Sequence, residues 1–399
     1  MTNFPYGFAN GLSVRGMPLT QMQPGQVFFV GNGPVLNPQA KGASNNNRGT
    51  FLDPLSTLDF AINTACKSGR GDIVFALPGH RETISNATTL SFNCGDVAVI
   101  GLGAGAMRPT LSFDTATTAN VPVRAGGCSI QNVLHLANFA DIASYYTGIS
   151  ASVTASIATS GLPAGMMGGL MTVTVVGSGT LYVGATIMGT AIVPGTKILS
   201  QISGTTGGVG TYQVSVSQTF ASGTITTGSQ DFAIDSCEFR DLSSALNALN
   251  VVTASSTDQS MAGLSFTRNN VYGLGTTAAT APFALASSLD RLTVAKNYIT
   301  NMVADNSVLI YQATTTKVIT RALIEDNTIV TVAEDAATGL LLITTATTHT
   351  GVIQRNNING LRAIATGILV TASSGFHFYD NKYHLTADIS GVILPAAQT

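Results

Sequence analysis

The chain has 399 residues, of which 45% are hydrophobic and only 10% are charged, and its formal net charge is −2 at pH 7. Ordinary globular chains contain about 25% charged residues. With 18 basic and 20 acidic residues there is no excess of positive charge, which argues against a nucleic-acid partner. No run of about 18 apolar residues occurs, which argues against a membrane span. The first residues lack the basic and apolar regions of a secretory signal, so we expect synthesis in the cytoplasm.

Residues 1–48 are rich in glycine, asparagine and proline, with a lone candidate strand at 28–30. We expect an N-terminal arm here that covers the end of the following domain or docks onto a partner. The only convincing helix pattern comes next, with Asp53 as N-cap, Pro54 as the first helical residue and Gly69 as the stop. A capping helix at this place would cover the open strand edges of the first β layer. Its apolar stripe is formed by Leu55, Leu58, Ile62, Ala65 and Cys66.

Strand patterns follow at 72–84, 97–103 and 128–133, and they predict the first repeats of a β domain within 49–150. His80 lies in the Pro78-Gly79-His80 turn and is expected at the surface or in an interface. The five histidines are scattered without metal-ligand spacing, so we expect neither a metal nor another cofactor. The cysteines lie far apart, which favours reduced core thiols over disulfides or metal ligands. They are Cys66, Cys94, Cys128 and Cys237.

Between 151 and 228 the character of the sequence changes. Short strand patterns at 172–176, 196–199, 212–216 and 224–226 are divided by glycine-rich turns. This spacing predicts a small all-β module of its own. Because insertions in repeat proteins emerge from the loops of single repeats, we expect the module to be spliced into the β domain.

From 229 to 399 one short pattern recurs around an asparagine, in the remaining repeats and a C-terminal tail. The steps between successive asparagines are 28, 30, 29 and 25 residues, and Cys237 occupies the same place 32 residues before the first of them. A repeat of this length indicates a solenoid, in which each unit buries its apolar face against the next. Stacked side-chain amides form hydrogen-bonded ladders, so we expect a structural ladder of Asn269, Asn297, Asn327, Asn356 and Asn381.

The pattern within a repeat indicates strand, bend, strand. Residues three before and two after the asparagine are always apolar, and asparagine itself suits a left-handed bend. A further strand fits between the copies, at 283–285, 308–311, 339–343 and 367–370. The sequence therefore predicts an all-β, right-handed parallel β-helix solenoid with an N-terminal capping helix and an inserted small all-β module. The alternative is a leucine-rich repeat, whose Leu-x-x-Leu-x-Leu frame is missing.

Two stretches carry a family resemblance. The segment 49–84, with its helix pattern and its Pro78-Gly79-His80 turn, resembles bacteriophage virion proteins with a right-handed, pectate-lyase-like β-helix. The segment 210–219 of the insert is similar to a small β module that recurs in phage structural and tail proteins. This resemblance implies a trimer on the surface of a virion, in contact with other virion proteins of the capsid or tail. It does not by itself imply catalysis.

Catalysis on a glycan would require carboxylates about 5 to 9 Å apart on one surface. The densest acidic patch consists of Asp231, Asp235, Glu238 and Asp241, and the first two have the parity to face one side of a strand. We interpret this patch as an outward polar edge, and the catalytic alternative stays open. The members of two further pairs are expected to point to opposite faces of strands or to lie in turns; these pairs are Glu325-Asp326 and Glu334-Asp335.

A stripe of mixed charge is expected directly before the asparagines, because opposite charges on neighbouring strands stabilise one another. It consists of Arg268, Lys296, Asp326, Arg355 and Asp380.

The leading hypothesis is therefore a non-enzymatic virion protein, displayed as a head decoration or short spike, with the insert as an adhesion or contact surface. The alternative is a receptor-binding tailspike that binds or cleaves host surface polysaccharide. A third option, a bacterial β-helix adhesin, is disfavoured by the missing signal pattern.

Overall fold

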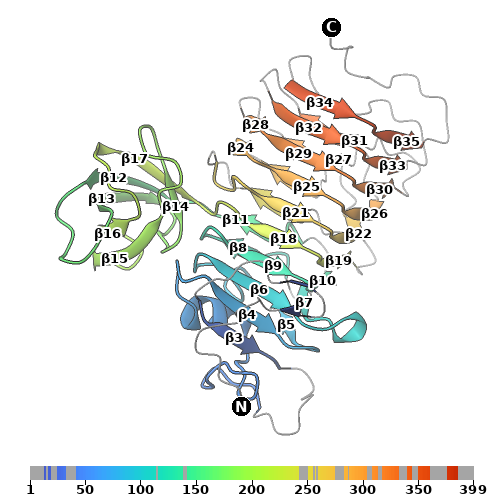
Figure 1. Ribbon diagram of the computed structural model, residues 1–399, viewed down its shortest axis with the longest axis horizontal. Coiled ribbons are helices and arrows are strands. Elements are labelled where there is room, and N and C mark those ends of the chain that lie inside the picture. The colour runs from blue at the N-terminus through green and yellow to red at the C-terminus, as the bar shows by residue number, and fades with distance from the viewer. Residues whose placement is uncertain are drawn as a thin grey trace.

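Three parallel β-sheets make up most of the structure (Figure 1). A computed structural model describes residues 13–14, 17–18, 25–32, 42–113, 116–137, 142–241, 250–254, 257, 259–274, 283–285, 287–302, 308–312, 317–331, 339–343, 349–359 and 375–384. Two small pairings accompany the large sheets, namely antiparallel β1 (Ser13–Val14) with β2 (Met17–Pro18) and parallel β24 (Leu289–Asp290) with β28 (Ile319–Thr320).

The largest sheet has ten strands, and every neighbouring pair is parallel. In spatial order they are β3 (Val27–Val30), β4 (Asp72–Ala76), β6 (Val97–Gly101), β9 (Ser129–Gln131), β18 (Ala233–Asp235), β21 (Ser265–Thr267), β25 (Thr293–Ala295), β29 (Ala322–Glu325), β32 (Thr350–Gln354) and β34 (Gly375–Tyr379). The apolar residue three places before each asparagine lies opposite its counterpart on the next strand, as predicted. This row runs through Ile130, Ile234, Phe266, Val294, Ile324, Ile353 and Phe378.

A second parallel sheet has nine strands. They are β5 (Arg81–Thr83), β7 (Thr110–Phe113), β10 (Leu134–Ala137), β19 (Glu238–Asp241), β22 (Asn270–Leu274), β26 (Tyr298–Met302), β30 (Thr328–Thr331), β33 (Asn357–Asn359) and β35 (Lys382–His384). The apolar residue two places after each asparagine again forms a row, with Phe239, Val271, Ile299 and Ile329 buried in it. The side chains of Ile358 and Tyr383, expected in the same row, lie outside the described residues.

The third parallel sheet has six strands. They are β8 (Val121–Val123), β11 (Tyr146–Gly148), β20 (Val252–Ala254), β23 (Phe283–Leu285), β27 (Val308–Gln312) and β31 (Gly339–Ile343). The predicted strands at 283–285, 308–311 and 339–343 are confirmed, whereas 367–370 lies outside the described residues. From β18 onward, the described residues contain no helix between the strands of successive repeats, whereas a leucine-rich repeat carries a helix or 3-10 turn in each repeat. The chain is thus mainly β, with parallel sheets of the β-helix type.

The helix begins later than the sequence predicted. It comprises α1 (Leu58–Phe60) and a π-helical continuation, η1 (Ala61–Ala65), and its N-cap is Thr57 instead of Asp53. The reason is that Leu55 is extended and exchanges backbone hydrogen bonds with β3, accepting from Gly31 and donating to Phe29. Gly69 does not stop the helix, which already ends at Ala65. The helix buries Leu58, Ala61 and Ile62 in the main core, and its role as a cap stays a prediction.

Aromatic side chains from all three parallel sheets meet in one core. Phe266 of the ten-stranded sheet packs against Phe239 of the nine-stranded sheet, with ring centroids 5.8 Å apart, and against Phe283 of the six-stranded sheet, at 5.0 Å. All four cysteines are buried free thiols, as expected. Burial raises the pKa of Cys128 and of Cys237 to about 12, so both stay protonated at neutral pH.

The expectation that His80 lies at the surface is wrong. Its side chain is fully buried, and its Nε2 is 2.8 Å from Oε1 of Glu82. The same carboxylate oxygen accepts a hydrogen bond from the backbone N–H of Leu58, at the beginning of the helix. Glu82 thus stabilises the N-terminus of the helix, because its carboxylate accepts a hydrogen bond from a backbone donor of the first helical turn that would otherwise be unpaired.

The insert forms a separate antiparallel sheet beside the parallel sheets, to the left in Figure 1. Its six strands are β12 (Ser152–Ala158), β13 (Gly169–Ser178), β14 (Thr186–Met188), β15 (Ile198–Gly204), β16 (Gly210–Val214) and β17 (Phe220–Gly228). Its apolar side chains form a hydrophobic cluster distinct from the main core. Sequence reasoning missed β12 and β14. The division of the chain at 48, 150 and 228 stays a prediction.

Candidate functional site

The five asparagines lie directly above one another where the strands of the ten-stranded sheet lead into those of the nine-stranded sheet; we call this bend the asparagine corner. Each Nδ2 donates to the carbonyl of the apolar residue one repeat earlier, as Asn327 does to Val294 at 2.8 Å. Each Oδ1 accepts from the backbone N–H at the equivalent position of that earlier repeat, which for Asn269 is the N–H of Cys237 at 2.8 Å. Because Asn269, Asn297, Asn327 and Asn356 are at most 2% exposed, these amides satisfy buried backbone groups that water does not reach.

The left-handed residue at this corner is the one before the asparagine, and not the asparagine as predicted. Positive φ angles of 48 to 59° occur at this place in six successive repeats. The asparagine instead keeps an ordinary φ, and its side chain points inward to the earlier repeat. These six left-handed residues are Ser236, Arg268, Lys296, Asp326, Arg355 and Asp380, and Asn132 has the same place one repeat earlier, with φ of 53°.

Charges at the asparagine corner pair between repeats. Arg268 binds the carboxylate of Asp235, which also accepts a hydrogen bond from Thr267 at 2.6 Å. Arg355 lies 2.7 Å from Asp326 and 2.8 Å from Glu325, so both members of this acidic pair meet one guanidinium instead of facing apart. The hydrogen bond from Arg355 lowers the pKa of the Asp326 carboxyl. Glu334 and Asp335 lie outside the described residues.

A second charged column, which sequence reasoning missed, precedes the strands of the ten-stranded sheet; we call this place the entry corner. Asp231, Arg291 and Arg321 are left-handed there, with φ of 51 to 59°. Arg291 reaches Asp231 at 3.0 Å across the intervening Gly263, where a Cβ would lie 2.1 Å from the Asp231 carboxylate. Arg321 binds Asp290 and lowers the pKa of its carboxyl. The signal was present, since Asp231, Gly263, Arg291 and Arg321 all lie six places before the asparagine position.

The four candidate catalytic carboxylates do not share one surface. Asp231 lies at the entry corner and Asp235 on the ten-stranded sheet, so their parity does not apply across the bend. Glu238 lies on the outer face of the nine-stranded sheet, 2.7 Å from Arg108 and bonded to Arg240. Asp241 is 1% exposed and has the inward parity of Phe239. Three of the four are thus held by arginines, in the manner of structural ion pairs.

The part of the chain that the structure describes offers no candidate for a metal site or for a membrane-spanning helix. No group of three or more His, Cys, Asp or Glu side chains there is arranged to hold a metal ion. None of the described helices is long and apolar enough to cross a bilayer.

The insert is fixed to the first repeats by polar contacts. Lys197 lies 2.7 Å from Asp96 at the entry corner, and the hydroxyl of Ser68 donates to the carbonyl of Val183 at 2.9 Å. Backbone approaches are closer still, since a Cβ on Gly184 would meet the backbone of Gly95 at 2.7 Å. The module is therefore seated on the stack of parallel sheets and is not held by its two connections alone.

A buried histidine lies among aromatic rings in the main core. His135 is fully buried, stacks on Phe239 with ring centroids 4.3 Å apart, and its Nε2 lies 2.6 Å from the hydroxyl of Tyr146. Burial lowers the pKa of His135 to about 3, because the apolar surroundings disfavour the charged ring. This arrangement serves packing, and it makes the stability of the fold depend on pH.

We expect His135 to lower the stability of the protein in mild acid. The unfolded chain binds a proton at this residue below about pH 6.5, whereas the folded chain stays neutral down to about pH 3. The unfolding free energy should therefore fall by about 2 kcal/mol between pH 7 and pH 5 on account of this group. Urea unfolding midpoints of the wild type and of His135→Gln at both pH values measure it. An identical pH dependence of the two proteins would contradict the assignment.

Comparisons with known proteins give no family. No family model matches the sequence, and no curated protein matches it either. Among solved structures, a GH136 lacto-N-biosidase from Eubacterium ramulus matches at 8% identity and a TM-score of 0.34, over 90% of this chain and 68% of that chain. A pectin methylesterase in complex with a hexasaccharide matches at 9% identity and a TM-score of 0.30, over 92% of this chain and 94% of that chain. The Streptococcus pneumoniae surface adhesin PfbA matches at 9% identity and a TM-score of 0.29, over 84% of this chain and 85% of that chain. Scores this low carry no argument about activity.

Proposed function

We propose that the chain is a non-enzymatic structural protein of a bacteriophage particle, in which the parallel sheets coil as a right-handed, capped solenoid and three chains form a trimer on the particle surface. In this role it acts as a head decoration or a short spike, and the insert provides the contact surface. The observation that carries the proposal is the nearly uncharged module seated firmly beside the solenoid.

The module has the surface of a protein-contact element. Residues 151–228 contain one charged side chain, Lys197, and that one is used in docking to Asp96. Half of the large hydrophobic side chains that are exposed in the described residues belong to this module, and exposed apolar side chains favour contacts with other proteins. Those of the module are Met166, Met167, Val175, Val193, Leu199 and Val209.

The arrangement of carboxylates supports a structural role over glycan cleavage. A hydrolase keeps a pair of carboxyl groups facing the bond to be cleaved, whereas Asp231, Asp235 and Glu238 each bind an arginine from another repeat or strand. Such pairs hold neighbouring repeats in register. The runner-up is a receptor-binding tailspike that cleaves polysaccharide with these acids.

We expect sedimentation equilibrium to give three times the chain mass of 41.0 kDa for the full chain. A monodisperse monomer would contradict the trimer. Limited proteolysis should leave the module attached to the solenoid, because its docking contacts restrain both.

In a separate assay, the protein is incubated with host capsule and tested for new reducing ends or unsaturated uronates. Cleavage that disappears in Asp235→Asn would establish the tailspike and overturn the structural assignment.

A further inference from the structure

The outer face of the nine-stranded sheet presents two tyrosine rings on adjacent strands. Tyr272 of β22 is 46% exposed and Tyr298 of β26 is 50% exposed. In the register of these strands, Asn270 lies opposite Tyr298 and Tyr272 lies opposite Thr300, so the two rings are diagonal neighbours on one face. Strands are about 4.8 Å apart and residues i and i+2 about 6.6 Å apart, so the two Cα atoms are separated by roughly 8 Å.

The rings stand on a rigid base. Val271 and Ile299, the neighbours of the tyrosines along each strand, are fully buried in the main core. Both strands also have a parallel partner on either side, β19 before β22 and β30 after β26. Because the backbone is held from three directions, little conformational freedom remains to be lost when a ligand covers the rings.

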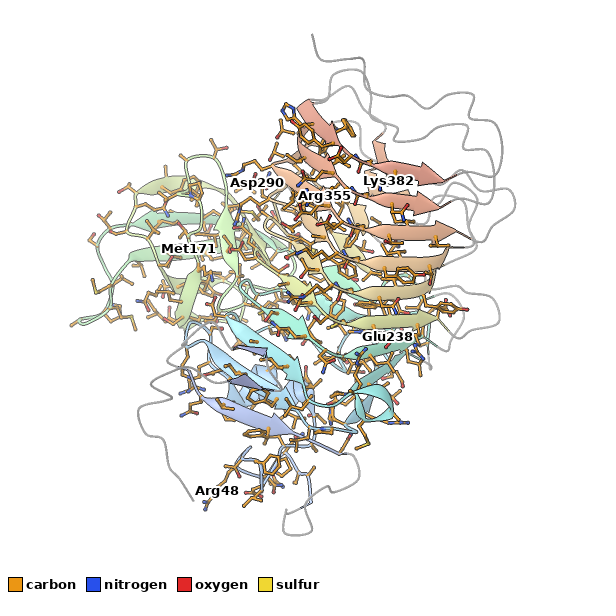
Figure 2. The ribbon with its side chains drawn as sticks, turned by 45° about the vertical axis from the view of Figure 1, so that its right-hand side comes forward. Arg48, Met171, Glu238, Asp290, Arg355 and Lys382 are labelled. Atoms are coloured by element: carbon orange, nitrogen blue, oxygen red, sulfur yellow. The ribbon has the colours of Figure 1, made fainter. Side chains whose placement is uncertain are left out.

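Polar side chains surround the tyrosines. Arg240 lies opposite Tyr272 on the preceding strand, and its guanidinium is bonded to Glu238, which also binds Arg108. Asn270 supplies an amide beside Glu238 on the same face. In Figure 2 Glu238 and Lys382 mark two separate levels of this sheet, with the tyrosine-bearing strands between them in the order of the sheet.

These groups suit a sugar chain better than the other possible occupants. A tyrosine offers a flat apolar ring with a polar hydroxyl, and amide and guanidinium groups form hydrogen bonds with hydroxyl oxygens. A nucleic acid would require several unpaired positive charges, whereas Arg240 and Arg108 share the carboxylate of Glu238, which leaves an excess of one positive charge in this group. A second protein copy would require a more continuous apolar surface, whereas these two rings are set among threonine, asparagine and charged residues.

We propose that Tyr272 and Tyr298, together with Asn270 and Arg240, form a platform that binds an oligosaccharide of a host surface glycan. This goes beyond the structural role proposed above, and it involves no bond cleavage. A sugar ring stacks on each tyrosine, and the amide and guanidinium bind its hydroxyl groups. The platform is a different face from the insert, so particle contact and glycan contact occur on separate surfaces.

The test uses the full chain on an array of oligosaccharides from bacterial capsules and lipopolysaccharides, followed by calorimetry with the strongest binder. The double variant Tyr272→Ala/Tyr298→Ala should weaken binding by on the order of 100-fold, about ten-fold for each ring. The matched control is Tyr379→Ala, which removes a tyrosine that is 53% exposed on the ten-stranded sheet and should leave affinity unchanged within about two-fold. Circular dichroism verifies that each variant is folded.

Three results would overturn the platform. These are a wild type that binds no member of the array, an equal loss of affinity in Tyr379→Ala, and a double variant that keeps its affinity. Sedimentation of the same samples separates this proposal from the particle role. If the wild type is a monomer and the double variant loses glycan binding, the trimer is contradicted and the platform is supported. A double variant that changes oligomeric mass and keeps its glycan affinity identifies the face as a protein interface.

Discussion

Phe266→Ala is expected to lower the unfolding free energy by about 4 kcal/mol, within the range known for buried phenylalanine. Phe266 is fully buried, and its ring contacts Phe239 and Phe283, so that one side chain joins all three parallel sheets. Truncation removes the transfer free energy of the ring and leaves a cavity. The walls of this cavity belong to paired strands, which cannot move inward without losing their register. Urea unfolding midpoints with the m-value held common give the difference in free energy.

The matched control is Phe266→Leu, which keeps most of the apolar volume and should cost about 1.5 kcal/mol or less. A small loss of unfolding free energy in Phe266→Leu, together with a much larger loss in Phe266→Ala, identifies cavity formation as the cause. Equal, small losses in both variants would mean that the three sheets do not share a core at this level.

The positions of the strands were predictable because stacking imposes the same condition on every repeat. A repeat must place an apolar side chain inward at the same point of every copy, and Ile234, Phe266 and Val294 meet this condition in the sequence and in the sheet register. The same constraint made Phe239 and Val271 recognisable two places after the asparagine position. A period-two pattern on each side of a fixed residue therefore carries most of the architecture.

The bends were predicted less well, because backbone conformation there is set by contacts between repeats. Asparagine is a common left-handed residue, yet in this fold its amide is required inward, and Asp326 or Arg355 takes the left-handed place instead. That shift turns Asp326 toward the same guanidinium as Glu325, which alternation along a single strand could not indicate. Left-handed arginine is uncommon, so a search based on residue preference overlooks it.

Burial of polar groups near the N-terminus had no signal in local sequence. His80 follows Pro78 and Gly79, a typical surface turn, but its Nδ1 accepts a hydrogen bond from the backbone N–H of Asn32, 48 residues earlier in the sequence. Leu55 fitted a helical stripe, yet its backbone completes the pairing of β3. Both outcomes depend on partners more than 20 residues away in the sequence, whereas helix and turn patterns extend over only a few residues.

Asn327→Ala should lower the unfolding free energy by about 3 kcal/mol, because it leaves buried backbone groups without partners. Its Nδ2 donates to the carbonyl of Val294 at 2.8 Å and its Oδ1 accepts from the backbone N–H of Asn297 at 3.1 Å. Both backbone groups belong to the neighbouring repeat, where no water reaches them. Asp326→Ala, the adjacent substitution at an exposed ion pair with Arg355, should cost less than about 1 kcal/mol.

Hydrogen exchange at single residues distinguishes the ladder from a general loss of stability. In Asn327→Ala the amide hydrogen of Asn297 loses its acceptor, so its protection should fall far more than that of amides paired within β6 and β9. In Asp326→Ala the Asn297 amide should keep its protection, because its acceptor is unchanged. The stability of stacked repeats is close to a sum of repeat and interface terms, so the loss should be largest in the repeats on either side of Asn327. Equal effects of the two substitutions on the Asn297 amide would mean that the asparagine side chain does not join the repeats, and the stacked architecture would then depend on the apolar rows alone.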